Sequence, residues 1–152
     1  MAAAPSERTR VKRLNKRAKY DAETVHGILD AMPVCSVGYV FKGAPFVTTT
    51  LQWREGDHIF WHGSAASRML EACENAEVCV SVSIIDGFVM ARSAFNHSCN
   101  YRSVMVFGTA RKITDPSGRA KTLSKLAAAA GAAGHHDRAA QLATAAEAAT
   151  RK

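Results

Sequence analysis

Val34-Cys35-Ser36-Val37-Gly38-Tyr39-Val40 is followed, after Lys42-Gly43-Ala44-Pro45, by Phe46-Val47-Thr48-Thr49-Thr50-Leu51. Both outer runs are rich in β-branched and aromatic residues, which favour strands, and the residues between them are typical of a turn. The pattern therefore predicts a β-hairpin. Arg54-Glu55-Gly56-Asp57 then turns the chain into a third predicted strand, His58 to His62.

Helices are predicted on either side of these strands. Between Tyr20 and Met32 the apolar residues are spaced to line one helical face, Asp21 stands where a cap is needed, and Pro33 ends the pattern. After the third strand, a second helix is expected to turn Met69, Leu70 and Cys73 inward and to end near Asn75.

The second half of the chain predicts further strands. Val78 to Ile85 is nearly continuous in apolar and Ser residues, and Asp86-Gly87 favours a two-residue turn into another strand, Phe88 to Phe95. After a polar loop, Tyr101 to Ile113 is a long predicted strand, and Asp115-Pro116-Ser117-Gly118 ends it before a last helical segment. About six strands with few helices between them imply a mainly β fold with added helices, an antiparallel barrel or sandwich.

The residues between the third strand and the second helix have the composition of a phosphate-binding turn: His62-Gly63-Ser64-Ala65-Ala66-Ser67-Arg68. Free backbone amides at a helix start, two hydroxyls and one guanidinium can together hold an anion. The alternative is purely structural, with Ser64 as an N-cap and Arg68 exposed further on.

The net charge of +7 is concentrated near the N-terminus, where seven basic residues stand against Glu7 alone in the first twenty. Such an arm can bind nucleic acid or an acidic surface, or can pack along its own domain or a neighbouring subunit. Tyr20 is the only aromatic residue there, so nothing supports base stacking, and nucleic acid is not expected as a partner.

The length of 152 residues suits one domain, with no stretch apolar enough to cross a membrane and no apolar signal core. We expect a cytoplasmic protein whose four cysteines are reduced core thiols, since they form no CxxC pair. The predicted organisation is a basic arm over residues 1–19, a domain over residues 20–126 and an alanine-rich tail over residues 127–152, attached loosely. His135-His136 in that tail, or His97 with Cys99, could touch a metal or haem, although the surrounding sequence explains both pairs without one.

In order and content the chain from Arg8 to Leu126 resembles the flavin-nucleotide-binding split-barrel proteins related to pyridoxamine phosphate oxidase, especially their nitroimidazole-reductase-like branch. The segments that carry the likeness are the basic arm with Tyr20-Asp21, Pro33-Val34-Cys35, Val37-Gly38-Tyr39-Val40, Pro45-Phe46-Val47, Gly56-Asp57, Trp61-His62-Gly63-Ser64, Ala66-Ser67-Arg68-Met69-Leu70, Ala91-Arg92-Ser93 and Asn100-Tyr101-Arg102-Ser103-Val104.

The resemblance implies a six-stranded antiparallel split barrel that forms a homodimer and holds one flavin mononucleotide (FMN) in each of two clefts between the subunits. In this sequence the flavin phosphate would be bound by the turn, through His62, Ser64, Ser67 and Arg68. The flavin ring would lie along Thr48, Thr49 and Thr50. Later strands would add to the cleft and to the subunit contact through Arg92, Tyr101, Arg102 and Ser103.

The sequence departs from the family pattern at two places. The nitroimidazole-reductase-like branch often has histidine after the cysteine of the first strand, where this chain has Ser36, and a serine cannot replace imidazole as a proton donor near neutral pH. Relatives also usually continue with further strand material beyond the point where this sequence stops.

The leading hypothesis is an FMN-dependent oxidoreductase that takes hydride from a nicotinamide donor and reduces a small-molecule acceptor, with the flavin supplying the redox chemistry. The alternative is a non-catalytic protein that holds haem or flavin on the same barrel. A third class, a nucleic-acid module, would depend on the basic arm.

Overall fold

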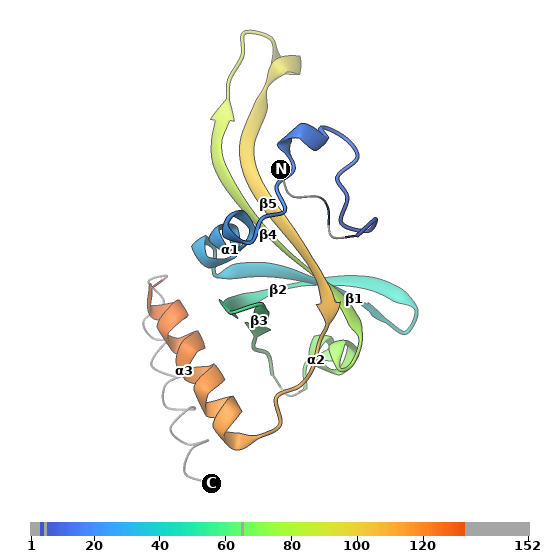
Figure 1. Cartoon of the computed structure of the whole chain (residues 1–152), viewed down its shortest axis with the longest axis vertical. Helices are drawn as coiled ribbons and strands as arrows, with labels where there is room; N and C mark the ends of the chain where they lie inside the picture. Colours follow the sequence, from blue (N-terminus) through green and yellow to red (C-terminus); the bar gives the residue numbers. More distant parts are fainter. Residues whose placement is uncertain (1–3, 5, 65, 133–152) are drawn as a thin grey trace.

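Antiparallel strands form one open sheet in the computed structural model, which describes residue 4, residues 6–64 and residues 66–132. Within these residues the sheet has five strands in the order β3-β2-β1-β4-β5, so that β3 and β5 are its edges (Figure 1). The strands are β1 Val34–Phe41, β2 Ala44–Glu55, β3 His58–Trp61, β4 Glu77–Val89 and β5 Ser98–Thr109. The helices are α1 Ala22–Ala31, α2 Arg68–Cys73 and α3 Pro116–Ala132, with short 3-10 turns η1 Asn15–Arg17 and η2 Ala94–Asn96. The predicted class, mainly β with added helices, is confirmed.

The first hairpin lies where the sequence predicts it. β1 pairs with β2 over its whole length, from Val34 opposite Leu51 to Phe41 opposite Ala44. The turn consists of Lys42 and Gly43, whose φ angles of 51° and 79° are both in the left-handed region. A two-residue type I′ turn requires that conformation at both central residues, and it matches the twist of the strands that it joins.

The predicted turn at Asp86-Gly87 is wrong. β4 continues through both residues and pairs with β5 from Glu77 opposite Thr109 to Val89 opposite Ser98. Neither Asp86 nor Gly87 has a positive φ, so no type I′ turn forms, and a register shift between Ile85 and Gly87 takes up the irregularity as a bulge. Two predicted strands thus merge into one, which is why five strands rather than six are found in the described part of the chain.

The main core lies between one face of the sheet and helices α1 and α2. Its fully buried members come from all of these elements and include Leu29, Val37, Met69, Cys73, Val80 and Val82. Because α1 and α2 lie on this face, the apolar positions predicted for both helices are confirmed in contact with it, Leu70 being only half-buried.

Helix α3 covers the other face of β2. Leu126 and Ala127 are buried there against Leu51 and Trp53, with Leu123 beside them. The alanine-rich stretch therefore begins as a packed helix, and α3 crosses the boundary predicted at residue 126. The rest of the predicted tail, with His135-His136, lies outside the described residues.

Helix α1 is fixed at both ends by side chains. The Asp21 carboxylate accepts a hydrogen bond from the Thr24 amide at 2.9 Å, which confirms the predicted N-cap. At the other end the Leu29 carbonyl has no amide four residues on, because Pro33 has none. The side chain of Gln52 on β2 replaces it: its Nε2 donates to the carbonyls of Leu29 and Met32, both at 2.7 Å.

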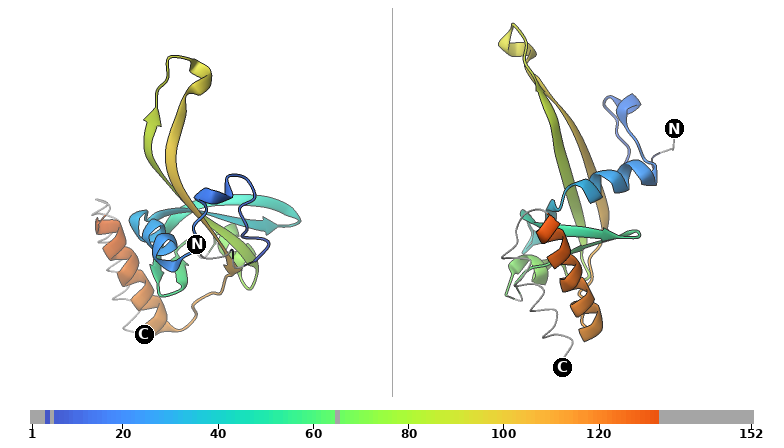
Figure 2. Two further views of the ribbon diagram at one scale, coloured as in Figure 1. Left: turned by 45° about the horizontal axis from the view of Figure 1, so that its top comes forward. Right: turned by 90° about the vertical axis from the view of Figure 1, so that its left-hand side faces the viewer.

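The β4–β5 hairpin extends well beyond the rest of the sheet (Figures 1 and 2). β1 pairs with β4 only at Ser36–Gly38, so the far half of the hairpin is a two-stranded ribbon. None of the helices that the structure describes is both long and apolar enough to span a bilayer.

Candidate functional site

The small-residue turn lies between β3 and α2, as the sequence predicts. Its conformation is held by the Ser67 amide, which donates to the Ser64 carbonyl at 2.8 Å, and by the Ala66 amide, which donates to Ser64 Oγ at 3.3 Å. The N-cap of α2 is Ser67 rather than Ser64, and the Ser67 side chain makes no capping hydrogen bond. Ser64 is therefore not the cap of α2, but its hydroxyl does accept from an amide next to Ser67 and Arg68 is exposed, as the purely structural interpretation predicts.

Arg68 is positioned by aromatic side chains rather than by a carboxylate. Its guanidinium lies 4.2 Å from the centroid of the Phe46 ring and 5.9 Å from that of Phe41. Both rings lie within cation–π distance of the guanidinium, and no acceptor among the described residues takes up its N–H groups. The hydroxyls of Ser64 and Ser67 and the guanidinium fork make a donor set that fits a phosphate. Helix α2 has only six residues, so its dipole adds little.

The three threonines of β2 point to two faces of the sheet. Thr48 and Thr50 lie on the core face, opposite Val37 and Cys35, and Thr49 lies on the other face, opposite Ser36. Thr50 Oγ1 donates to the His62 carbonyl at 3.0 Å, and Thr48 Oγ1 is 3.1 Å from the hydroxyl of Tyr39. Thr50 and Phe46 thus connect β2 directly to the turn, whereas Thr49 points to the opposite face of the sheet.

Arg102 and Ser103 lie elsewhere within the chain. They stand on β5, three strands away from β2, or about 14 Å at the usual spacing of strands. Arg102 Nε and Nη2 donate to the Asp86 carboxylate at 2.7 to 3.1 Å, and this fork lowers the pKa of Asp86 and raises that of Arg102. Ser103 is exposed opposite Ser83. One chain alone does not place these two residues beside the turn.

A row of three small hydroxyl side chains and one methionine crosses the sheet on the face of Thr49. The register places Thr49, Ser36, Ser81 and Met105 side by side on four successive strands. Ser36 occupies the position at which the family resemblance leads one to expect histidine. Within this row there is consequently no group that titrates near neutral pH.

The cysteines are not placed as reactive groups. All four are free thiols, and burial raises the pKa of Cys35 to about 11. Burial also raises the pKa of Cys73 and Cys79. The thiols of Cys35, Cys73 and Cys79 therefore remain protonated at neutral pH and behave as small apolar side chains.

No group of three or more His, Cys, Asp or Glu residues that could hold a metal occurs in the described part of the chain. His97, one of the predicted alternatives for a metal or haem, accepts a hydrogen bond at Nδ1 from the Ala91 amide at 3.0 Å. It thereby fixes the turn at the end of the β4–β5 hairpin, and its neighbour Cys99 is half-buried in β5.

The sequence interpretation missed three residues that hold the site in place. Gln52 joins β2 to α1, and Phe46 supports Arg68. Asp86 fixes Arg102, but it was assigned to a turn. A signal existed for Gln52: a lone amide in the apolar half of a strand, in a chain whose preceding helix ends at a proline.

Comparison with known families and structures gives consistent results. The family model described as pyridoxamine 5'-phosphate oxidase matches residues 21–151. The chain is 51% identical to the solved flavocytochrome Anf3 from Azotobacter vinelandii, with a TM-score of 0.76 over 82% of this chain and 58% of that one. It is 37% identical to the FAD and heme binding protein from Mycobacterium smegmatis, with a TM-score of 0.61 over 66% of this chain and 50% of that one.

A third structure, the FAD binding protein from Mycobacterium smegmatis, shares the fold at 14% identity, with a TM-score of 0.50 over 63% of this chain and 79% of that one. Comparison with curated protein sequences gave no match. The chain spans between half and three fifths of the length of its two more similar structural relatives. None of these proteins points to the nitroimidazole-reductase-like branch.

Proposed function

Because the chain belongs to the pyridoxamine 5'-phosphate oxidase family, we propose that it is a flavin-dependent oxidoreductase. The observation that carries this proposal is 51% identity, over 82% of the chain, to a protein described as a flavocytochrome. The donor set around Arg68 agrees with it, since it fits the phosphate that every flavin nucleotide carries.

The flavin would be held by the residues of the turn and of β2. Ser64, Ser67 and Arg68 would bind the phosphate next to the ribityl chain, with His62 beside them. Of the candidate threonines of β2, either Thr49 or the pair Thr48 and Thr50 would line the ring, because the two sets point to opposite faces of the sheet. FMN and FAD share this phosphate, so the same turn can bind either nucleotide. We propose that the flavin bound by this chain is FMN.

The proposed reaction transfers hydride from a nicotinamide donor and passes the electrons to a small acceptor. The bound flavin would supply the redox chemistry, while the chain supplies the anchor, the orientation of the ring and the shape of the cleft. Since the row that contains Ser36 offers no acid or base near neutral pH, acceptors that need no proton from this row should be preferred over nitro compounds.

We also propose that the site is completed in a homodimer. Arg102 and Ser103 stand too far from the turn within one chain, and the ribbon that carries them extends away from the sheet (Figure 1). A second copy would bring its own Arg102 and Ser103 toward the turn of the first. We also propose that the complete protein has the sixth strand and the closed barrel that the family resemblance implies.

A second candidate is a protein that holds haem without catalysing flavin chemistry. The observation in its favour is that haem or a cytochrome is named in the descriptions of both of the more similar structures.

The first experiment is an absorbance spectrum of the purified protein, followed by titration with FMN and with FAD under fluorescence detection. Flavin bands and saturation at one flavin per chain would support the proposal, and the two titrations would show which nucleotide binds more tightly. A Soret band without flavin binding would favour the haem candidate. Absence of binding to both flavins would exclude the proposed function.

A further inference from the structure

We propose that residues 10–19, called the basic loop below, dock the acidic face of a folded one-electron carrier protein. This inference rests in part on the proposed function, because the carrier would exchange electrons at the same flavin site. The docking itself depends only on the basic loop, so it can be measured separately.

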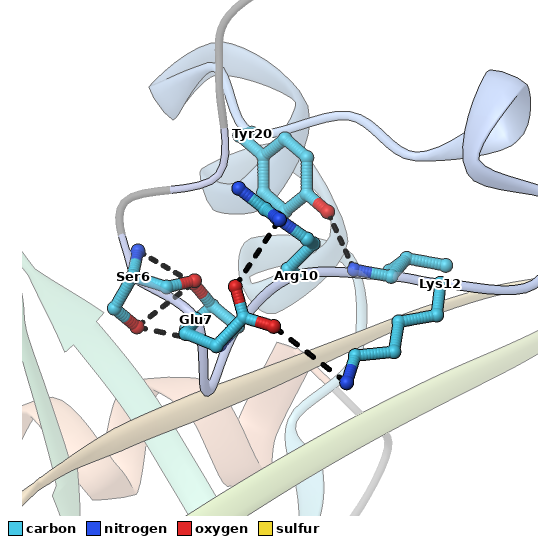
Figure 3. A network of polar contacts seen from close by, with 7 residues as sticks. Ser6, Glu7, Arg10, Lys12 and Tyr20 are labelled. Carbon is cyan, nitrogen blue, oxygen red and sulfur yellow. Dashed lines mark hydrogen bonds and ion pairs between the residues drawn. The ribbon is translucent and has the colours of Figure 1, made fainter.

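The basic loop has a fixed conformation. The hydroxyl of Tyr20 accepts a hydrogen bond from the Val11 amide at 2.8 Å, and the carboxylate of Glu7 pairs with Arg10 at 3.2 Å and with Lys12 at 3.6 Å (Figure 3). The Arg17 amide donates to the Leu14 carbonyl at 2.9 Å. Hydrogen bonds and ion pairs at both the base and the tip of a loop are typical of a preorganised surface rather than of a solvated tail.

The tip of the basic loop presents an apolar side chain among unpaired cations. Leu14 is 59% exposed, and its φ of 55° is a left-handed conformation that is costly for a leucine. Next to it in the sequence, three exposed side chains have no ion-pair partner among the described residues: Arg13, Lys16 and Arg17. An apolar centre with a cationic rim is the composition expected of a protein-binding patch.

The basic loop wraps around the free edge of the sheet. Before it, the Arg8 guanidinium lies 5.4 Å from the centroid of Phe107 and pairs with Glu77 at 3.2 Å. At its other end, Lys19 lines an open hollow of about 540 Å³ with residues of α1 and with Arg102. Phe107 belongs to the same face as Ser36 and Thr49, through the row Val47, Gly38, Cys79 and Phe107. The arm is thus anchored about 10 to 15 Å from the proposed ring-binding residues, counted in strand spacings.

A protein surface fits these features better than nucleic acid or a membrane does. The one ring near the basic loop, Tyr20, is half-buried and its hydroxyl accepts a hydrogen bond from Val11, so no free aromatic ring is offered for stacking on bases. Membrane-surface segments carry several large apolar anchors on one face, whereas this loop exposes only Val11 and Leu14. The fixed conformation of the loop adds no affinity for a fluid membrane surface or for the uniform charge of a nucleic-acid backbone. It can, however, be complementary to a structured acidic patch on a protein.

The carrier would take up electrons that the hydride donor supplies. One reduced nicotinamide loses two electrons and releases one proton, and two carriers are each reduced by one electron. A one-electron carrier needs no proton at the site, which agrees with the absence of an acid or base in the row of Ser36.

The test uses the soluble acidic domain of cytochrome b5 as the probe, with basic cytochrome c as a probe of opposite charge. Lys16→Gln/Arg17→Gln should lower the association rate with cytochrome b5 by about tenfold at low salt and flatten its dependence on salt. The matched control is Arg111→Gln/Lys112→Gln, which removes the same two residue types from an exposed segment after β5 and should change nothing. Leu14→Gly relieves the strained φ and removes the apolar contact, and it should mainly speed dissociation.

Direct binding and flavin-dependent reduction of the probes are measured in parallel. Binding of cytochrome b5 that survives when flavin is absent would support docking even if the proposed function failed. Equal binding of both cytochromes, or equal losses in the control variant, would overturn the proposal. So would binding to phosphatidylserine vesicles or to duplex DNA without binding to cytochrome b5.

Discussion

Arg68 is the residue on which the proposed phosphate site most depends, because its guanidinium is oriented by Phe46 and has N–H groups to offer. Arg68→Ala should weaken flavin binding by about 1 to 3 kcal/mol, roughly 5- to 150-fold in Kd, since a charge-assisted hydrogen bond is lost. Fluorescence titration of the folded variant measures this. Arg68→Lys keeps the charge but loses the fork of N–H donors, so its flavin affinity should lie between those of the parent protein and Arg68→Ala. Unchanged affinity in Arg68→Ala would remove Arg68 from the site.

Gln52 is 1% exposed, and its two hydrogen bonds satisfy carbonyls that α1 cannot satisfy. Gln52→Met keeps the size but leaves both carbonyls buried without donors, so the free energy of unfolding should fall by about 2 to 4 kcal/mol. Urea unfolding followed by circular dichroism measures this loss. The control is Thr49→Val, an exposed change on the same strand, which should stay within about 0.5 kcal/mol of the parent protein.

At the residue scale, the sequence predicts which residue types can bind a phosphate, but not which side chains pair with one another in the fold. Ser64, Ser67 and Arg68 were identifiable because hydroxyls and a guanidinium in one turn have a common use. The pairing of Arg102 with Asp86 could not be predicted, since it depends on a cross-strand register that a bulge shifts. Strand alternation separates Thr49 from Thr48 and Thr50, but the inward face is decided only by the packing of α1 and α2.

At the scale of elements, Asp21 makes the start of α1 sensitive to pH. Its hydrogen bond to Thr24 lowers the pKa of the Asp21 carboxyl below the ordinary 3.8, so the stability that it contributes is present above that value and is lost as the pH falls through the lower pKa of the folded state. Asp21→Ala should therefore lower the Tm at neutral pH, and the difference from the parent protein should shrink on acidification below 3.8.

Asp21→Asn separates charge from capping in the same experiment, because its amide oxygen still accepts from Thr24. Its Tm at neutral pH should stay near that of the parent, without the acid-dependent loss. A constant difference between Asp21→Ala and the parent across the whole pH range would contradict a role of the ionised carboxylate. Thermal unfolding by circular dichroism at stepwise lower pH gives all three curves.

Two dipeptides show why some elements were predictable and one was not. Lys42-Gly43 makes the tight turn that its surroundings predict, since both residues adopt positive φ. Asp86-Gly87 is the stronger turn signal by composition, yet it lies within β4, where pairing with β5 continues on both sides. A local preference of about 1 kcal/mol is outweighed by the added ladder pairs and side-chain contacts of a longer hairpin.

At the scale of the whole molecule, the two halves of the β4–β5 hairpin differ in their contacts with the rest of the chain. Near Phe107 of the edge strand β5, the basic arm contacts the sheet through Arg8, which also pairs with Glu77 of β4. The far half of the β4–β5 ribbon projects away from the rest of the described residues (Figure 2). The single domain that length and composition predict stays a prediction, and the proposed contact with a second copy cannot be derived from the pattern of one sequence.

That ribbon leads to the last prediction, which concerns oligomeric state. Phe88, Met90 and Phe95 are 76%, 77% and 95% exposed, and a two-stranded ribbon with such side chains is only marginally stable in water. We therefore expect the protein to sediment as a homodimer and Phe88→Ser/Met90→Ser to shift it to monomer, with weaker flavin binding because the partner's Arg102 and Ser103 are lost from the site. Val40→Ser, a single apolar-to-serine change at an exposed position outside the ribbon, should remain dimeric. Sedimentation velocity at several concentrations, with and without flavin, decides the matter: a parent protein that is monomeric throughout yet binds flavin tightly would show that one chain suffices for the site.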